Sequence, residues 1–104
     1  MEQVFNGQSA DGNSTNFKHL GNSKALNIYV AGDLGGGTVT VQAQTPDESG
    51  WIMVAGGEFT AAGMHSVFSA PFVGRLVLSG SAGASVDAYI ESDNGASQDR
   101  VFNA

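Results

Sequence analysis

The sequence contains no cysteine, and it has only two prolines and four basic residues among its 104 residues. Without cysteine the chain has neither disulfides nor a thiol nucleophile, so we expect packing, helped by association between copies, to stabilise it. Charged residues make up 13% of the chain, about half the usual share, so Ser, Thr, Asn, Gln and Gly must cover much of its surface. No apolar run reaches the roughly 20 residues that cross a bilayer.

The basic residues are scattered and outnumbered by acidic ones. Lys18, Lys24, Arg75 and Arg100 face ten acidic residues, which gives a formal net charge of −6 at pH 7. A nucleic-acid-binding protein needs clustered positive charge, and an anionic membrane repels an acidic protein. We therefore expect neither nucleic acid nor membrane as a partner. Residues 1–6 also lack a basic segment followed by an apolar one, so we expect synthesis in a cytoplasm without a secretion signal.

Alternation of apolar and polar residues with a period of two is the main pattern of the chain. In residues 38–45 it continues over eight positions, as in a strand with one buried and one solvated face. Similar alternation and short apolar runs predict further strands. The predicted strands cover residues 25–31, 38–45, 51–54, 64–68, 75–79 and 85–92. No segment keeps a helical period over ten residues.

Turn-forming residues separate these strands. They include three glycines at residues 35–37 and a Pro-Asp-Glu-Ser-Gly turn at residues 46–50. About seven or eight short antiparallel strands, spaced about ten residues apart, predict an all-β fold with one β-sandwich domain over residues 1–104. We expect a jelly-roll-like strand order. Period counting leaves an immunoglobulin-like order open, although the Cys–Trp–Cys set typical of that order is missing.

The two ends of the chain differ from its middle. Residues 1–16 and 94–104 are rich in polar and turn residues, yet they contain the apolar pairs Val4-Phe5 and Val101-Phe102. One interpretation is that each end packs a strand onto the sandwich. The other is that each end is an arm that adds a strand to the sheet edge of a neighbouring molecule. In that case Val4, Phe5, Val101 and Phe102 contact the partner.

The sequence lacks the residue patterns of an active site or a metal site. His19 and His65 lie far apart, and a lone histidine in a strand is typical of a surface or hydrogen-bonded residue. Residues 11–13 lack the alternating carboxylates of a calcium loop and are interpreted as a turn. Asp87 and Glu91 share a strand face but lie about 13 Å apart, too far for a glycosidase pair. We therefore predict a protein that is not an enzyme and has no metal and no cofactor.

Trp51 is the one side chain large enough to anchor a ligand or a partner protein. It follows Gly50 at the start of an apolar strand, where packing into the core is the expected role. Stacking on a sugar, as in a carbohydrate-binding module, is an alternative. Because tryptophan is a frequent anchor at protein interfaces, Trp51 joins the predicted partner contacts.

A succession of segments between residues 25 and 92 gives the sequence a family likeness. A strand ends in a Gly-Gly turn, a second strand leads to an acidic Gly-Trp turn, and an Arg-Leu strand precedes a final Ser-Val strand. The segments are residues 30–42, 46–51, 59–63, 74–80 and 84–90. This succession resembles small structural proteins of tailed bacteriophages, in particular the capsid decoration or cement proteins.

The resemblance implies a β-sandwich that assembles as a homotrimer on the exterior of a phage head. The implied partners are copies of the chain itself and the major capsid protein, and the implied location is the virion, made in the cytoplasm of a bacterial host. The resemblance carries no diagnostic binding residue. A phage tail or fibre component is the nearest alternative. Outside the phage class, the alternative is a carbohydrate-binding or other ligand-binding β-sandwich module.

Overall fold

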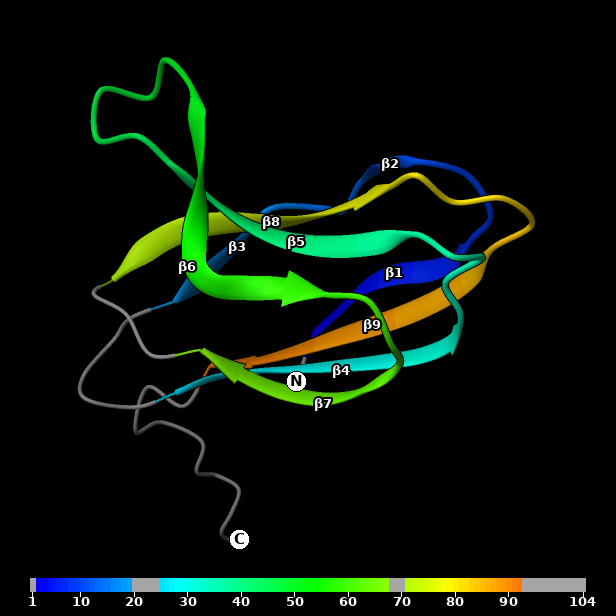
Figure 1. The fold of residues 1–104 in the computed structure, drawn as a ribbon. Coiled ribbons are helices and arrows are strands. Elements are labelled where there is room, and N and C mark those ends of the chain that lie inside the picture. Colours follow the sequence, from blue (N-terminus) through cyan, green and yellow to red (C-terminus); the bar gives the residue numbers. More distant parts are fainter. Residues whose placement is uncertain (1, 20–24, 68–70, 93–104) are drawn as a thin grey trace, which may run out of the picture.

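The computed structural model of the chain describes residues 2–19, 25–67 and 71–92, and the regular structure in these ranges is all β (Figure 1). The strands are β1 (Glu2–Gln8), β2 (Gly12–Asn13), β3 (Phe17–His19), β4 (Leu26–Asp33), β5 (Thr38–Gln44), β6 (Trp51–Phe59), β7 (Gly63–Val67), β8 (Phe72–Ser79) and β9 (Ser85–Ser92). All six strands that the alternation predicts are present. None of the described residues forms a helix long and apolar enough to cross a membrane.

The strands form two antiparallel sheets that lie face to face (Figure 1). Sheet A has the order β1-β9-β4-β7, and sheet B has the order β2-β8-β5-β6, with β3 also paired to β8. The short β2 and β3 therefore share one position beside β8. If β2 and β3 are counted as one strand and the strands are renumbered along the chain, the two sheet orders become 1-8-3-6 and 2-7-4-5. This strand order is that of a jelly roll. The predicted β-sandwich is confirmed, and the split strand raises the strand count above the expected number.

The core lies between the two sheets, where the period-two alternation sends every second side chain. Leu26, Ile28 and Val30 of β4 face Val39, Val41, Leu76 and Leu78 of sheet B, and all of them are at most 5% exposed. Each such side chain contributes about 1.5–3 kcal/mol when it leaves water. The central pairs β4–β9 and β5–β8 keep their register throughout, from Leu26 opposite Ser92 to Asp33 opposite Ser85 in the first.

The N-terminal end is part of the sandwich. β1 pairs with β9 at the edge of sheet A, and Val4 and Phe5 are only 7% and 2% exposed within the core. Of the two interpretations of this end, the structure therefore has the strand packed onto its own sandwich. Because Val4 and Phe5 are buried, they present no surface to a partner, contrary to the arm interpretation. Residues 94–104, with Val101 and Phe102, lie outside the described residues.

β6 bends sharply part-way along its length (Figure 1). Its residues 51–53 pair with one part of β5 and its residues 58–59 with another, so residues 54–57 form a bulge between the two parts. A bulge of this kind bends the strand that carries it. As a result, the β5–β6 hairpin with its turn projects beyond the sandwich (Figure 1).

Candidate interaction site

The outer face of sheet A carries a polar network. Glu91 accepts hydrogen bonds from the Tyr29 hydroxyl at 3.1 Å and from the Asn27 amide at 3.5 Å. The Ser66 hydroxyl donates to Asn27 Oδ1 at 2.8 Å. Burial, and then the bonded, charged Glu91, raises the pKa of Tyr29. The residues of this face therefore satisfy much of one another's hydrogen bonding, as expected of the solvated face of residues 85–92.

The outer face of sheet B holds a different arrangement, built around Trp51 and Arg75. Trp51 lies opposite Gln44 of β5, and Arg75 of β8 lies opposite Gln42. The Arg75 guanidinium lies over the Trp51 ring, with its Cζ 4.1 Å from the ring centroid. Arg75 Nε also donates a hydrogen bond to Gln42 Oε1 at 2.9 Å. An aromatic face and an amide thus hold the guanidinium in one position, and the stacking alone contributes about 0.5–2 kcal/mol.

This arrangement corrects the expected role of Trp51. Its side chain is half-buried and lies on the outer face of sheet B rather than in the core cluster. The reason is the register with β5, because Trp51 lies beside the outward-facing Gln44. Arg75 also occupies one face of the indole, which leaves less of the ring for stacking on a sugar.

The largest exposed apolar side chains lie on β6 and β7, which are edge strands of the two sheets. Ile52 and Met53 of β6 are 57% and 54% exposed, and Met64 of β7 is 65% exposed. β6 is the edge of sheet B, and β7 is the edge of sheet A. Of the apolar run 51–54, only Val54 packs against the core. Sequence reasoning assigned this run to a strand but missed its exposure. The available signal was four consecutive apolar residues without alternation, a pattern that leaves apolar side chains on both faces of a strand.

The turn at the tip of the β5–β6 hairpin is held by its own side chains. Asp47 accepts hydrogen bonds from the Thr45 hydroxyl at 2.6 Å, the Ser49 hydroxyl at 2.8 Å and the Ser49 amide at 3.1 Å. These bonds lower the pKa of Asp47 to about 2. Glu48, the next residue, is exposed and has a φ of 62°. It is the only non-glycine residue in the described ranges whose φ is positive. The tip is therefore an ordered turn that presents one glutamate to solvent.

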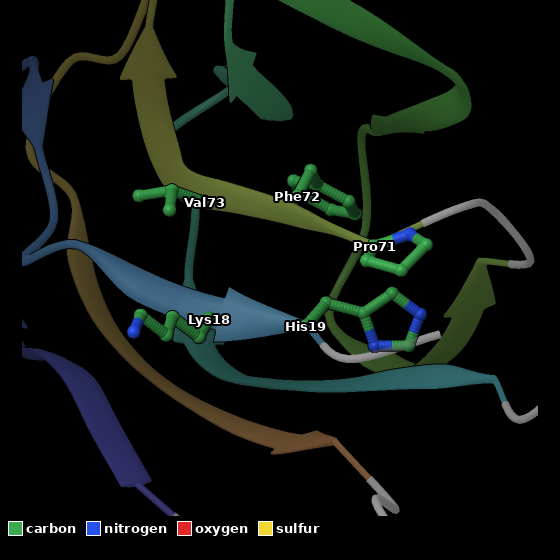
Figure 2. Close-up of a pocket in the computed structure, with 5 residues that line it drawn as sticks. All are labelled: Lys18, His19, Pro71, Phe72 and Val73. Carbon is green, nitrogen blue, oxygen red and sulfur yellow. The ribbon is translucent and has the colours of Figure 1, made fainter. Parts of the chain in front are cut away.

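A pocket of about 310 Å³ opens where β3 meets the start of β8 (Figure 2). Lys18, His19, Pro71, Phe72 and Val73 line it. The His19 ring is 1% exposed and stands edge-on to Phe72 at 5.5 Å between centroids, and burial lowers the pKa of His19. His19 is thus buried rather than on the surface. The Lys18 ammonium points away from the His19 ring (Figure 2), and no carboxylate lines the pocket, so the lining lacks an acid–base pair.

The remaining candidates from the sequence have structural roles. Asp11 accepts hydrogen bonds from the Gly80 amide at 3.0 Å and from the amide and hydroxyl of Ser81 at 2.9 and 2.6 Å. It therefore joins the β1–β2 loop to the β8–β9 turn, and the Ser81 bonds lower its pKa. His65 stacks on Phe59 at 4.0 Å between ring centroids. In the described part of the chain, no group of three or more His, Cys, Asp or Glu side chains is placed to hold a metal ion.

No family model, no curated protein and no solved structure matches this chain. The interpretation of its function therefore depends on the sequence and on the surface described above. That surface combines exposed apolar side chains with an ordered tryptophan–arginine pair. Tryptophan and arginine are over-represented among the residues that dominate protein–protein binding, so the arrangement is suited to binding a protein.

Proposed function

We propose that this chain is a non-enzymatic structural protein of a phage virion, a capsid decoration protein that binds the assembled head as a homotrimer and stabilises it. The observation that carries the proposal is the edge strand β6, where Met53 is exposed on the same face as the ordered Trp51–Arg75 pair and Ile52 is exposed on the opposite face. Large apolar side chains exposed on an edge strand are candidates for contact with another protein. The sequence resemblance supports the phage class.

The fold is compatible with this role but does not decide it. Jelly rolls occur in viral capsid domains, and they also occur in lectins and cupins. The low share of charged residues, 13%, means that few long, flexible side chains lose entropy when the surface is covered. A surface of this composition favours broad contact with protein.

The stabilising effect follows from linkage. A protein that binds the assembled shell but not the free capsid subunits lowers the free energy of the shell and leaves that of the free subunits unchanged. The shell is thereby stabilised against disassembly. The proposed partners are copies of the chain and the major capsid protein, on the capsid exterior. The net charge of −6 opposes any contact with packaged nucleic acid.

Two alternatives remain distinguishable by experiment. A tail or fibre component uses the same contact surface at another place in the virion. A carbohydrate-binding module requires an accessible aromatic ring, and the contact of Arg75 with one face of Trp51 counts against that alternative.

The test is co-sedimentation with empty heads assembled from the major capsid protein of a tailed phage. We expect saturable binding to expanded heads and none to free capsid subunits. Binding to purified tails but not to heads would replace the proposal with the tail alternative. Failure to bind either particle, together with a change in Trp51 fluorescence on adding an oligosaccharide, would replace it with the binding-module alternative.

A further inference from the structure

We propose that each copy in the homotrimer binds the next through its β5–β6 hairpin, with Glu48 of one copy seated on the Trp51–Arg75 pair of its neighbour. This inference rests on the proposed function, because it assumes that the chain assembles with itself. It goes further by naming the contact and the two charged groups that form it.

The binding site on the neighbouring copy is Arg75, whose guanidinium can donate hydrogen bonds to a carboxylate. Within the described residues, the contacts of Arg75 are the Trp51 ring and the Gln42 amide, and neither neutralises its charge. Its Nε is already bonded to Gln42, whereas the terminal amino groups have no protein acceptor in these ranges. A guanidinium fixed in this way loses little entropy when it binds a carboxylate. Among the described residues Arg75 has no carboxylate partner, which is notable in a chain with ten acidic residues and four basic ones.

The carboxylate that Arg75 binds can be found by elimination. In the described ranges, five of them accept hydrogen bonds within the chain. These are Asp11, Asp33, Asp47, Asp87 and Glu91. Three described carboxylates, Glu2, Glu48 and Glu58, accept none, and all three residues are exposed. Among these three, Glu48 alone lies in the turn between β5 and β6, the hairpin that projects beyond the sandwich (Figure 1).

The backbone at Glu48 gives an independent reason to select it. Its φ of 62° lies in the left-handed region, which costs a side-chain-bearing residue about 1–2 kcal/mol relative to glycine. Residues with a strained backbone of this kind cluster at functional sites. Glycine would relieve the strain at this position but would remove the carboxylate.

The proposed homotrimer requires a contact that closes into a ring. A heterologous contact gives a ring when the rotation from one copy to the next closes, and an open filament when it does not. Glu48 and Trp51 belong to the same hairpin, and the exposed Ile52 and Met53 follow Trp51 along β6. Met53 shares the face of Trp51 and Arg75, so its burial and one Arg–Glu pair would occur together at each contact.

The experiment is a charge exchange followed by sedimentation velocity over a range of protein concentrations at neutral pH. We expect Glu48→Arg and Arg75→Glu each to weaken trimer formation by at least about tenfold in the dissociation constant, because like charges then meet. The double variant, Glu48→Arg with Arg75→Glu, restores the pair in the opposite sense and should recover most of the affinity. Glu58→Arg is the matched control, since it changes the same charge on an exposed residue of β6 and should leave association unchanged.

Glu48→Gly separates this contact from folding. This variant should be more stable than the wild type as a monomer, because the backbone strain is relieved, yet it should associate more weakly. A variant that merely misfolds cannot produce that combination of results.

Each outcome has one meaning. A wild-type trimer that neither charge reversal weakens, or a double variant that recovers nothing, overturns the hairpin contact and leaves the proposed function standing. A wild-type chain that stays monomeric at all concentrations and in the presence of empty heads overturns both. Weakening by each reversal with recovery in the double variant supports the contact.

Discussion

Two glycine-to-alanine substitutions test the packing of sheet A quantitatively. Gly32 of β4 has a φ of 97°, and a Cβ added to it would lie 2.1 Å from the Ser85 carbonyl oxygen of β9. Gly36, in the β4–β5 turn, has a φ of 74°, and a Cβ there would meet no atom within 4 Å. Both substitutions carry the cost of a positive φ, but only Gly32→Ala adds a clash with backbone.

The magnitudes follow from these two terms. The positive φ costs about 1–2 kcal/mol for a residue with a Cβ, so Gly36→Ala should lower the free energy of unfolding by that amount. The clash at Gly32 adds about 1–3 kcal/mol of overpacking. The carbonyl of Ser85 can yield only if the β4–β9 ladder shifts, since Asp33 pairs with Ser85 and Gly32 with Val86. We therefore expect Gly32→Ala to cost about 2–5 kcal/mol in total.

The assay is urea unfolding followed by the fluorescence of Trp51, with the free energy extrapolated to water. A domain of this size is stable by about 5–15 kcal/mol, so the loss at Gly32 should move the midpoint far more than the loss at Gly36. Equal losses for the two variants would refute the reasoning, because they would mean that β4 and β9 do not approach closely at this point.

Three further predictions concern titration and the core. Burial lowers the pKa of His19, so as pH falls the unfolded chain binds a proton at this residue before the folded chain does. The free energy of unfolding should therefore decrease as pH drops below about 6.5. In urea unfolding at pH 7 and pH 5, His19→Phe should show a smaller decrease than the wild type. The pKa of Asp47 is about 2, below its ordinary value of 3.8, so its contribution to the free energy of unfolding is present above pH 3.8 and is lost as pH falls toward 2. An NMR titration of the Asp47 carboxyl carbon should have its midpoint near pH 2. A midpoint near pH 4 would contradict the hydrogen bonds of the turn. Leu76→Ala, at a side chain with no exposed surface, should lower the free energy of unfolding by about 2–5 kcal/mol, and a loss below 1 kcal/mol would mean that this side chain is not in a packed core.

The local pattern of the chain predicts its strands well. Leu26, Ile28 and Val30 alternate with polar residues because β4 has one buried and one solvated face, and this rule holds wherever sheet packing is one-sided. The strand order needs more information, because it depends on pairings between distant segments such as Gly32 with Val86. The two-residue β2 and three-residue β3 are too short to carry an alternation at all.

The interaction site was only partly predictable. Trp51 was identified as an anchor from its size, but its place on the outer face depends on the register with β5 beyond the bulge at residues 54–57. The role of Arg75 could not be predicted from the sequence, because no residue near it along the chain indicates its contacts with Trp51 and Gln42. The burial of His19 likewise results from the contact with Phe72, a residue of another strand.

Calorimetry of the phage shell tests the central claim most directly. Empty expanded heads would be heated with and without a saturating amount of the purified chain, and free capsid subunits would be heated in the same way. We expect the chain to raise the temperature at which the shell melts and to leave the unfolding of free subunits unchanged. An unchanged melting temperature of the saturated shell would contradict it.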